Sequence, residues 1–201
     1  MALINTTTTG VLGTTVYGDG AGTLTIQQDG VTINQISSTG LLNGRLTAMT
    51  AQASTSGTSI DFTGIPSWVK RITVMFSGVS TSGTSFRQVQ LGSGSIVTTG
   101  YLSTGFGWTG GTGGASSTTG LLFDGASTPV AALNYNSVMT INNFGSNTWI
   151  SSAITTATTG TVSQFVTTGS IALSGTLDRV RITTVNGTDT FDAGSINILY
   201  E

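Results

Sequence analysis

Val69-Lys70-Arg71-Ile72-Thr73-Val74-Met75-Phe76 is the stretch that decides the fold of this chain of 201 residues. Within it, Ile72, Val74 and Phe76 occupy every second position. Successive side chains of a strand point to opposite faces, so this spacing places the three apolar groups on one face. β-Branched residues also suit the pleated surface of a sheet. The stretch therefore predicts a β-strand with one face in a hydrophobic core.

Short strand-like runs continue on both sides of this stretch, at intervals of roughly ten residues. They cover residues 59–62, 86–91, 101–108, 121–123, 133–141, 149–154, 164–166, 171–173, 177–185 and 195–200. Loops rich in Gly, Ser and Thr separate them, such as 77–85 and 109–119, and no window has a convincing helical period. Parallel α/β folds need crossover helices and are excluded. We expect an all-β protein with an antiparallel, jelly-roll-like β-sandwich over residues 58–201, and the closing strand inside one of its sheets.

Residues 1–57 have a different character. They contain no Trp or Phe, and a single aromatic residue, Tyr17. Residues 24–33 alternate apolar and polar on both sides of Asp29-Gly30, which predicts a hairpin. The segment has too few large apolar groups for a core of its own. It is therefore either a disordered tail or a segment ordered against sister chains or a docking partner, and we assign it as an attachment or stem segment.

The composition excludes several classes of function. Lys and Arg number six, Asp and Glu number eight, and charged residues make up 7% of the chain, against about 25% in an average protein. The chain has no His and no Cys, which excludes Ser-His and Cys-His catalysis, imidazole metal sites, disulfides and thiolate clusters. We expect no enzyme activity and no cofactor. The net charge of −2 without a basic run argues against nucleic acid, and no apolar run approaches the ~20 residues needed for membrane insertion.

A Gly/Ser/Thr-rich composition also occurs in flexible linkers. Thr occupies 40 positions, Ser 24 and Gly 29. Disordered chains usually combine low hydrophobicity with high net charge or many prolines. Here the hydrophobic content is 37%, the mean hydropathy is +0.24 and there are two prolines. The composition therefore favours a folded protein that keeps itself soluble with hydroxyl groups in place of charges.

Tyr101, Phe106 and Trp108 are the candidate ligand-binding residues. They stand among glycines and hydroxyl residues, and Phe106 and Trp108, two apart, share one face of a strand. Aromatic rings can stack on the C–H faces of sugars while hydroxyls meet sugar hydroxyls, so these residues form a candidate glycan site. The alternative is that the rings fill a core or an axis between subunits. Trp68 and Trp149 lie in or beside strand patterns and are expected in the core.

The few charged residues have structural and functional interpretations. Asp189 and Asp192 follow the Asn186-Gly187 turn signal, where Asp commonly makes turn hydrogen bonds; the alternative is a cation or catalytic pair. Asp61, Lys70, Arg71, Arg179 and Arg181 are expected to form ion pairs across neighbouring strands or at a subunit contact. The alternative is a site for an acidic sugar.

Three segments carry a family resemblance. They are Ala2-Leu3-Ile4-Asn5-Thr6-Thr7-Thr8-Thr9-Gly10 with Gly22-Thr23-Leu24-Thr25-Ile26-Gln27, then Ile60-Asp61-Phe62-Thr63-Gly64-Ile65-Pro66-Ser67-Trp68-Val69-Lys70-Arg71-Ile72, and Leu177-Asp178-Arg179-Val180-Arg181-Ile182-Thr183 with Phe191-Asp192-Ala193-Gly194-Ser195-Ile196. These segments resemble fibre proteins of tailed bacteriophages. The resemblance implies a homotrimeric, non-enzymatic virion protein, assembled in the host cytoplasm. Its N-terminal segment, 1–57, would attach to other virion proteins, and its head, 58–201, would be a β-sandwich.

Two functions follow from the resemblance. In the first, the chain is a short tail fibre whose head recognises a glycan of the host surface. In the second, it is a capsid decoration, head-fibre or tail-adaptor protein with no receptor role. A length of 201 residues leaves little room for the long shaft of a full tail fibre.

Overall fold

The computed structural model describes residues 15–18, 24–28, 31–37, 40–41, 46–108, 112–125, 130–131, 133–159 and 161–201. The chain divides into two compact units, 1–45 and 46–201. The second unit begins earlier than the boundary at residue 58 expected from composition. The reason is that β5 (Thr47–Ala48) and β6 (Gln52–Ala53) pair with the closing strand of that unit.

The first unit is a small antiparallel sheet. It comprises β1 (Thr15–Gly18), β2 (Leu24–Gln28), β3 (Val31–Ser37) and β4 (Gly40–Leu41), hydrogen-bonded in that order. The predicted hairpin is confirmed by the pairing of β2 with β3, in which Gln28 lies opposite Val31. The turn residues themselves, Asp29 and Gly30, lie outside the described residues. The attachment role of residues 1–57 stays a prediction.

The second unit contains a large antiparallel sheet. Its strand order is β12-β11-β16-β15-β14-β8-β18-β5, with β6 also paired to β18. The remaining strands of this sheet are β8 (Arg71–Thr81), β11 (Leu102–Trp108), β12 (Thr112–Ser117), β14 (Asn134–Gly145), β15 (Thr148–Thr159), β16 (Thr161–Ala172) and β18 (Phe191–Tyr200). The closing strand β18 lies between β8 and β5, as expected from the sequence.

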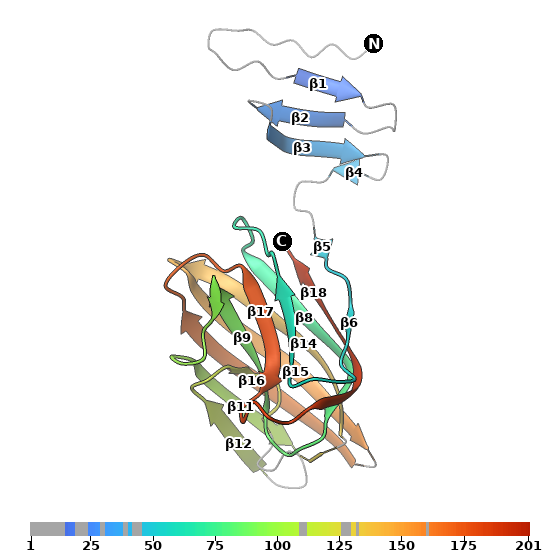
Figure 1. Cartoon of the computed structure of the whole chain (residues 1–201), viewed down its shortest axis with the longest axis vertical. Coiled ribbons are helices and arrows are strands. Elements are labelled where there is room, and N and C mark those ends of the chain that lie inside the picture. The colour runs from blue at the N-terminus through green and yellow to red at the C-terminus, as the bar shows by residue number, and fades with distance from the viewer. Residues whose placement is uncertain are drawn as a thin grey trace. The chain divides into compact units, whose positions relative to one another are not determined.

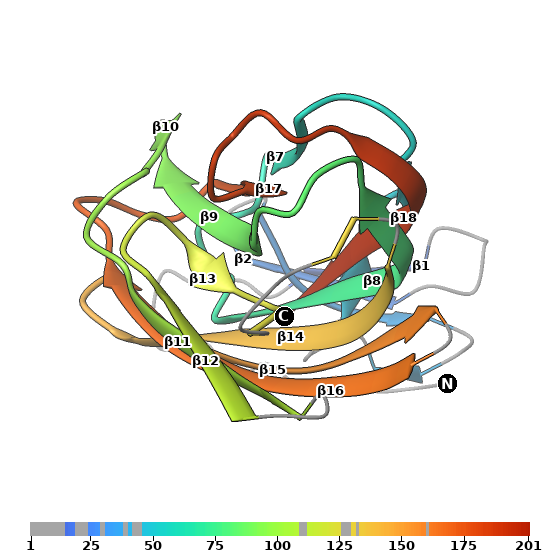
Figure 2. The same cartoon turned by 90° about the horizontal axis from the view of Figure 1, so that it is seen from below.

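A smaller antiparallel sheet lies over one face of the large one. Its order is β10-β9-β17-β7, and β13 also pairs with β9. Its strands are β7 (Ser59–Thr63), β9 (Arg87–Ser93), β10 (Ser95–Ile96), β13 (Leu121–Leu122) and β17 (Arg179–Thr184). Figure 1 shows the strands along the chain, and Figure 2 shows the two sheets of this unit as two layers. All the described elements are strands, so the expectation of an all-β antiparallel protein is confirmed.

The core fills the space between these two layers. Ile72, Val74 and Phe76 of β8 are each 4% exposed or less, which confirms the face predicted from the opening stretch. The small sheet contributes apolar groups from the opposite side, among them Phe62 and Ile182. The rings of Phe76 and Phe123 stack with centroids 4.0 Å apart. Alternation along the strands thus directs one face of each sheet into a shared apolar interior.

Four of the predictions from the sequence are wrong. The predicted loop 77–85 starts inside β8, which continues to Thr81. The runs 164–166 and 171–173 belong to one strand, β16, because the hydroxyl-rich residues between them pair with both neighbouring strands. The predicted loop 109–119 contains β12, a strand without large apolar residues that pairs with β11 at the end of the sheet order. Trp149 is buried, but Trp68 is 53% exposed and lies against Tyr200, ring centroids 5.7 Å apart, instead of in the core.

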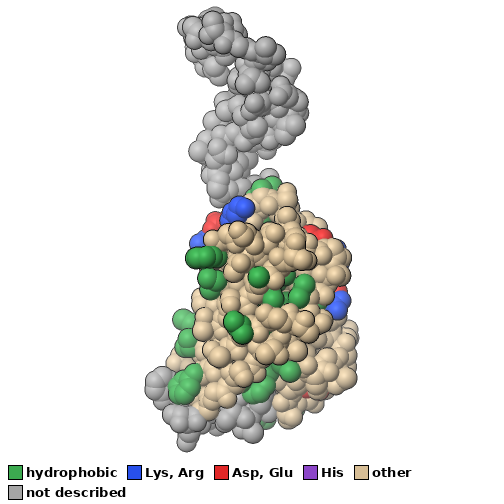
Figure 3. All heavy atoms as spheres, turned by 90° about the vertical axis from the view of Figure 1, so that its left-hand side faces the viewer, with side chains coloured by type: hydrophobic (Ala, Val, Ile, Leu, Met, Phe, Trp, Pro, Cys, Tyr) green, Lys and Arg blue, Asp and Glu red, His purple; other side chains and the backbone are tan. Residues whose placement is uncertain are grey.

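The face of the molecule shown in Figure 3 carries few charged side chains. Between Ile72 and Leu177 the sequence has two charged residues, Arg87 and Asp124, and both are buried. Among the described residues, no helix is long and apolar enough to cross a bilayer.

Candidate functional site

The candidate site lies on the outer face of the large sheet, away from the core. The strands β11, β16, β15 and β14 lie side by side there. Because side chains alternate, every second residue of each strand faces outward. Described outward residues of these strands include Leu102, Thr104, Phe106, Gln164, Val166, Thr168, Ser170, Ala172, Thr148, Ile150, Ser152, Ile154, Thr156, Asn134, Asn136, Val138, Thr140 and Asn142. None of these side chains carries a charge, so the face is a mixture of hydroxyls, amides and apolar groups.

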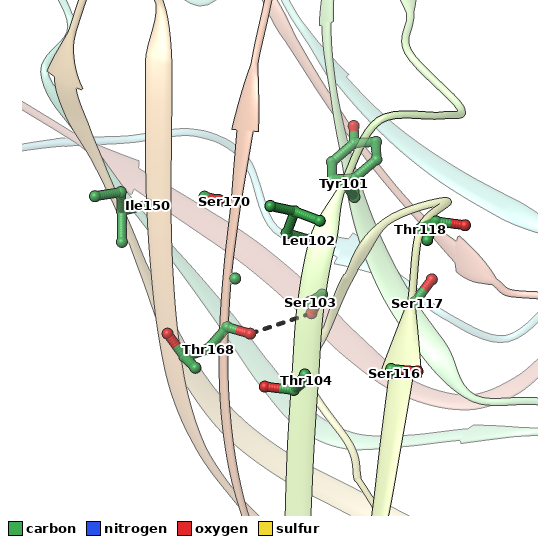
Figure 4. Close-up of a pocket in the computed structure, with 11 residues that line it drawn as sticks. Tyr101, Leu102, Ser103, Thr104, Ser116, Ser117, Thr118, Ile150, Thr168 and Ser170 are labelled. Carbon is green, nitrogen blue, oxygen red and sulfur yellow. Dashed lines mark hydrogen bonds between the residues drawn. The ribbon is translucent and has the colours of Figure 1, made fainter.

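A pocket of about 470 Å³ opens on this face, at its β11–β12 end. Its lining residues are Tyr101, Leu102, Ser103, Thr104, Ser116, Ser117, Thr118, Ile150, Thr168, Gly169 and Ser170. Figure 4 shows that they come from β11, β12 and its continuation, β15 and β16. Leu102 and Ile150, which are 72% and 42% exposed, supply apolar surface. Most of the remaining lining residues are Ser and Thr, so the pocket combines aliphatic carbon with hydroxyl groups.

Hydrogen bonds hold the strands beneath the pocket in place. The Ser103 hydroxyl donates to the carbonyl oxygen of Thr168 at 3.3 Å, the contact drawn in Figure 4, and accepts from the Leu122 amide at 2.9 Å. The Thr168 hydroxyl donates to the carbonyl oxygen of Ser151 at 3.1 Å. These bonds tie β11, β13, β15 and β16 together, so the pocket is built on a rigid sheet.

The structure separates the three aromatic residues proposed from the sequence. Tyr101 is fully buried. Its hydroxyl accepts from the Leu91 amide at 2.7 Å and donates toward the carbonyl oxygen of Val97 at 3.0 Å. Burial raises the pKa of Tyr101 to about 12, against the effect of its hydrogen bond with Leu91. Its ring therefore has no face open to a sugar, and the core alternative describes this residue.

Phe106 and Trp108 are on the neighbouring part of β11. Phe106 is 43% exposed on the outer face. It stands five residues after Tyr101, and an odd separation along a strand places the two side chains on opposite faces. The backbone of Trp108 lies in β11 opposite Gln164, but its side chain lies outside the described part of the structure. Of the three predicted residues, Phe106 is thus the one that the structure places on the open face.

The glycines beside these aromatic residues pack against the interior of the domain. Gly105 packs against Gly125, where a β-carbon would lie 2.9 Å from the Gly125 α-carbon. A β-carbon on Gly107 would overlap the ring of Phe165. The glycine spacing read as part of a sugar-binding surface is therefore explained by close packing in the interior.

The charged candidates are engaged in structural contacts. Arg181 lies directly opposite Asp61 in the register of β17 and β7, and forms two hydrogen bonds of 2.7 Å with it, which confirms the expected cross-strand pair. Arg179 pairs instead with its neighbour Asp178, at 2.8 and 3.0 Å. The hydrogen bond from Arg179 holds the pKa of Asp178 below its ordinary value. Both arginines thus have carboxylate partners, which leaves little positive charge available to bind an acidic sugar.

Asp189 takes part in turn hydrogen bonds. It accepts from the Ser85 amide at 2.9 Å and from the Asn186 side-chain amide at 2.7 Å. Asp192 accepts from the Ser80 hydroxyl. In the part of the chain that the structure describes, no three His, Cys, Asp or Glu side chains are placed to share a metal ion. The turn interpretation fits Asp189, which bonds Asn186 within the turn, but it is wrong for Asp192, which lies in β18 and accepts from Ser80 of the neighbouring strand β8.

A buried polar cluster around Arg87 is not among the sites predicted from the sequence. Its guanidinium Nη1 donates to Asp124 at 3.0 Å and to the Tyr135 hydroxyl at 2.9 Å, and Nη2 donates to the Thr81 hydroxyl at 2.7 Å. The guanidinium carbon also lies 4.2 Å from the Tyr135 ring centroid. Burial raises the pKa of Asp124 to about 6, although Arg87 lowers it. Two lone, opposite charges within a long uncharged stretch were the available signal.

Comparisons of the chain with protein-family models, with curated proteins and with solved structures gave no match.

Proposed function

We propose that this chain is a structural protein of a bacteriophage virion, a short homotrimeric tail fibre whose jelly-roll-like β-sandwich head binds a glycan of the host surface. The virion assignment is supported by the resemblance of its two ends and first strands to phage fibre proteins. Residues 1–57 attach it to other virion proteins, and the protein has no catalytic role.

The observation that carries the binding function is the uncharged pocket beside Leu102. Sugars present hydroxyl edges and apolar C–H faces, and binding sites for them need both kinds of surface. The pocket offers aliphatic side chains from β11 and β15 next to Ser and Thr hydroxyls on β11, β12 and β16. The lining has no carboxylate and no cation, so the glycan that fits it is a neutral one. Phe106 stands two residues from Thr104 on the same face and extends this surface.

An array of bacterial surface polysaccharides tests the binding function. The full chain is expected to bind neutral members in preference to acidic ones. Leu102→Ala and Ile150→Ala remove apolar wall from the pocket and are expected to weaken binding about tenfold each, the equivalent of ~1.4 kcal/mol. Val185→Ala, at another exposed apolar position, is the matched control and should bind as the wild type. A chain that binds no polysaccharide on the array contradicts the receptor role.

The second function, a capsid decoration, head-fibre or tail-adaptor protein, differs in its place on the particle. Cryo-electron microscopy of the virion separates the two. Density for this chain at the tail supports the fibre function, whereas density on the capsid shell refutes host adhesion as its main role. Light scattering of the purified chain checks the homotrimer, and a monomer at micromolar concentration contradicts it.

A further inference from the structure

A row of hydroxyl residues crosses four strands on the outer face of the large sheet. Thr104 of β11 lies opposite Thr168 of β16, Thr168 lies opposite Ser152 of β15, and Ser152 lies opposite Thr140 of β14. All four side chains are outward, three of them exposed and Thr140 half-buried. Neighbouring strands are about 4.8 Å apart, so this hydroxyl row presents donors and acceptors at a regular interval across the sheet.

An apolar row runs beside the hydroxyl row, two residues further along β11. Phe106 lies opposite Val166, Val166 opposite Ile154, and Ile154 opposite Val138. The three aliphatic members are between 55% and 67% exposed. Directly opposed outward residues have neighbouring β-carbons, so the apolar row is continuous across the same four strands.

The two rows together form a trough. Phe106 and Ile154 on one side and Leu102 and Ile150 on the other have longer side chains than the Ser and Thr of the hydroxyl row, whereas Val166 and Val138 are the same length as Thr. The floor is therefore hydroxyl, one wall is apolar, and the other alternates apolar groups with Ser170 and Asn142. The pocket of about 470 Å³ contains the Thr104 and Thr168 end of the hydroxyl row. A second hollow of about 410 Å³ contains Ser152 and Thr140, with Ile154, Val166 and Val138 as its wall.

The chemistry of the trough selects one class of occupant. A hydroxyl can both donate and accept, which matches a ligand whose own groups do both. The Thr168 hydroxyl donates to the Ser151 carbonyl oxygen and therefore offers a ligand an acceptor. The walls match the C–H faces of sugar rings. The outward residues of these four strands carry no charge, so an anionic or cationic polymer would lose its hydration without gaining a counter-charge. The length of the row, four strands wide, exceeds what one sugar covers at a strand spacing of about 4.8 Å.

We infer that the trough binds an extended, uncharged polysaccharide that lies across β11, β16, β15 and β14, with several consecutive sugars in contact. This inference rests on the proposed glycan-binding function and names its ligand class and full site. The sugars nearest β12 occupy the pocket beside Leu102, and those further along occupy the hollow beside Val138. Hydroxyls of the floor bond the sugar edges while the apolar row covers one face of the rings.

Binding of a length ladder tests the trough. The probe is the polysaccharide that binds best on the array, cut into fragments from a single sugar to an octasaccharide, and titrated calorimetrically into the full chain. Affinity is expected to rise with length until the trough is filled. Thr104→Leu fills the pocket end of the floor and Ser152→Leu fills the far end. Each substitution is therefore expected to weaken binding of the longest fragment at least tenfold. Thr156→Leu, on β15 beyond the apolar row, is the matched control and should leave binding unchanged.

The outcomes separate this inference from the proposed function. If Thr104→Leu weakens binding but Ser152→Leu does not, the ligand occupies the pocket alone. The trough is then overturned and glycan binding stands. If no fragment binds, the proposed function itself fails. If Val138→Asp changes the molecular mass of the particle in solution and binding does not depend on fragment length, this face is a contact between copies of the chain. That result also overturns the trough as a polysaccharide site. Far-UV circular dichroism confirms that each variant is folded, as expected for outward side chains.

Discussion

Replacement of Arg87 by Met tests the reasoning about the buried charges of the core. Arg87 and Asp124 have 0% and 1% of their side chains exposed and are 3.0 Å apart. Methionine keeps much of the volume of the arginine stem and removes its charge. The Asp124 carboxylate then has no cation in an apolar interior. Loss of one member of a buried pair costs about 3–5 kcal/mol, and we expect a loss of this size in the free energy of unfolding at pH 8.

The pH dependence of that loss is the diagnostic feature. In the wild type the folded-state pKa of Asp124 is about 6, above its ordinary value of 3.8, because burial outweighs the attraction of Arg87. A folded-state pKa above the unfolded one gives stability that is present at low pH and lost as pH rises through the folded value. In Arg87→Met the lowering by Arg87 is absent, so this loss continues above pH 6. The gap to the wild type therefore widens by up to ~1.4 kcal/mol per pH unit between pH 6 and the variant's own pKa.

Guanidinium denaturation at pH 6, 7 and 8 measures the gap. The chain has no His and no Cys, so no other side chain has an ordinary pKa in this interval. The double variant Arg87→Met/Asp124→Asn, which has no carboxylate, is expected to lose the extra pH dependence. Arg181→Met breaks the exposed pair with Asp61 and is expected to cost only about 0–1 kcal/mol. A gap for Arg87→Met that is the same at pH 6 and pH 8 would refute the reasoning.

Three further predictions concern the fold. Gly105→Ala places a β-carbon 2.9 Å from the Gly125 backbone and is expected to lower the free energy of unfolding by about 1–3 kcal/mol. In the control Gly114→Ala the nearest neighbour of the new β-carbon would be 3.4 Å away, so the loss of stability should be smaller. Equal losses for the two variants in denaturant titrations would contradict this. Deletion of residues 195–201 removes most of a strand inside the large sheet, so circular dichroism should show no cooperative unfolding transition; a transition like that of the full chain would disprove it. The Asp178 carboxyl should titrate below pH 3.8 when followed by carbon NMR, so its contribution to stability is lost as pH falls through that lowered pKa. Arg179→Met should return the midpoint of this titration toward 3.8. A titration midpoint that this substitution leaves unchanged would argue against the pairing.

The sequence predicts the strands and their buried faces because alternation is local information. Ile72, Val74 and Phe76 were assigned to the core from spacing alone, and all three are buried. Spacing does not predict a strand whose own apolar residues are few. Strand β12 (Thr112–Ser117) has no large apolar residue, and it is a strand because its backbone pairs with β11. The central part of β16 is likewise set by two neighbouring strands instead of by its own apolar groups.

The candidate site depends on which residues of neighbouring strands lie opposite each other, and the alternation of side chains within one strand does not predict this register. Tyr101 and Phe106 are predicted as parts of one site, but their odd separation along the chain places them on opposite faces of the sheet, with Tyr101 buried and Phe106 exposed. The hydroxyl row could not be predicted, because Thr104 and Thr168 come together only through the pairing of β11 with β16. A one-residue slip in that pairing would turn the whole set to the other face. Common residues such as Ser and Thr become a candidate site only when the sheet aligns them.

The placement of charge connects the core to the proposed site. Between Ile72 and Leu177 the chain has two charged residues, and it buries both in one pair. A buried pair contributes little net stability compared with apolar residues of the same volume, so stability alone does not account for it. The strands that form the trough present hydroxyls and apolar groups without a single charge among their described outward residues. An added charge on this face, as in Thr140→Asp, should therefore abolish binding of the longest neutral fragment while leaving the unfolding transition nearly unchanged. The control Thr156→Asp, outside the trough, should have a much smaller effect on that binding. Equal loss of binding in the two variants would show that the neutrality of the whole face, and not the trough, governs recognition.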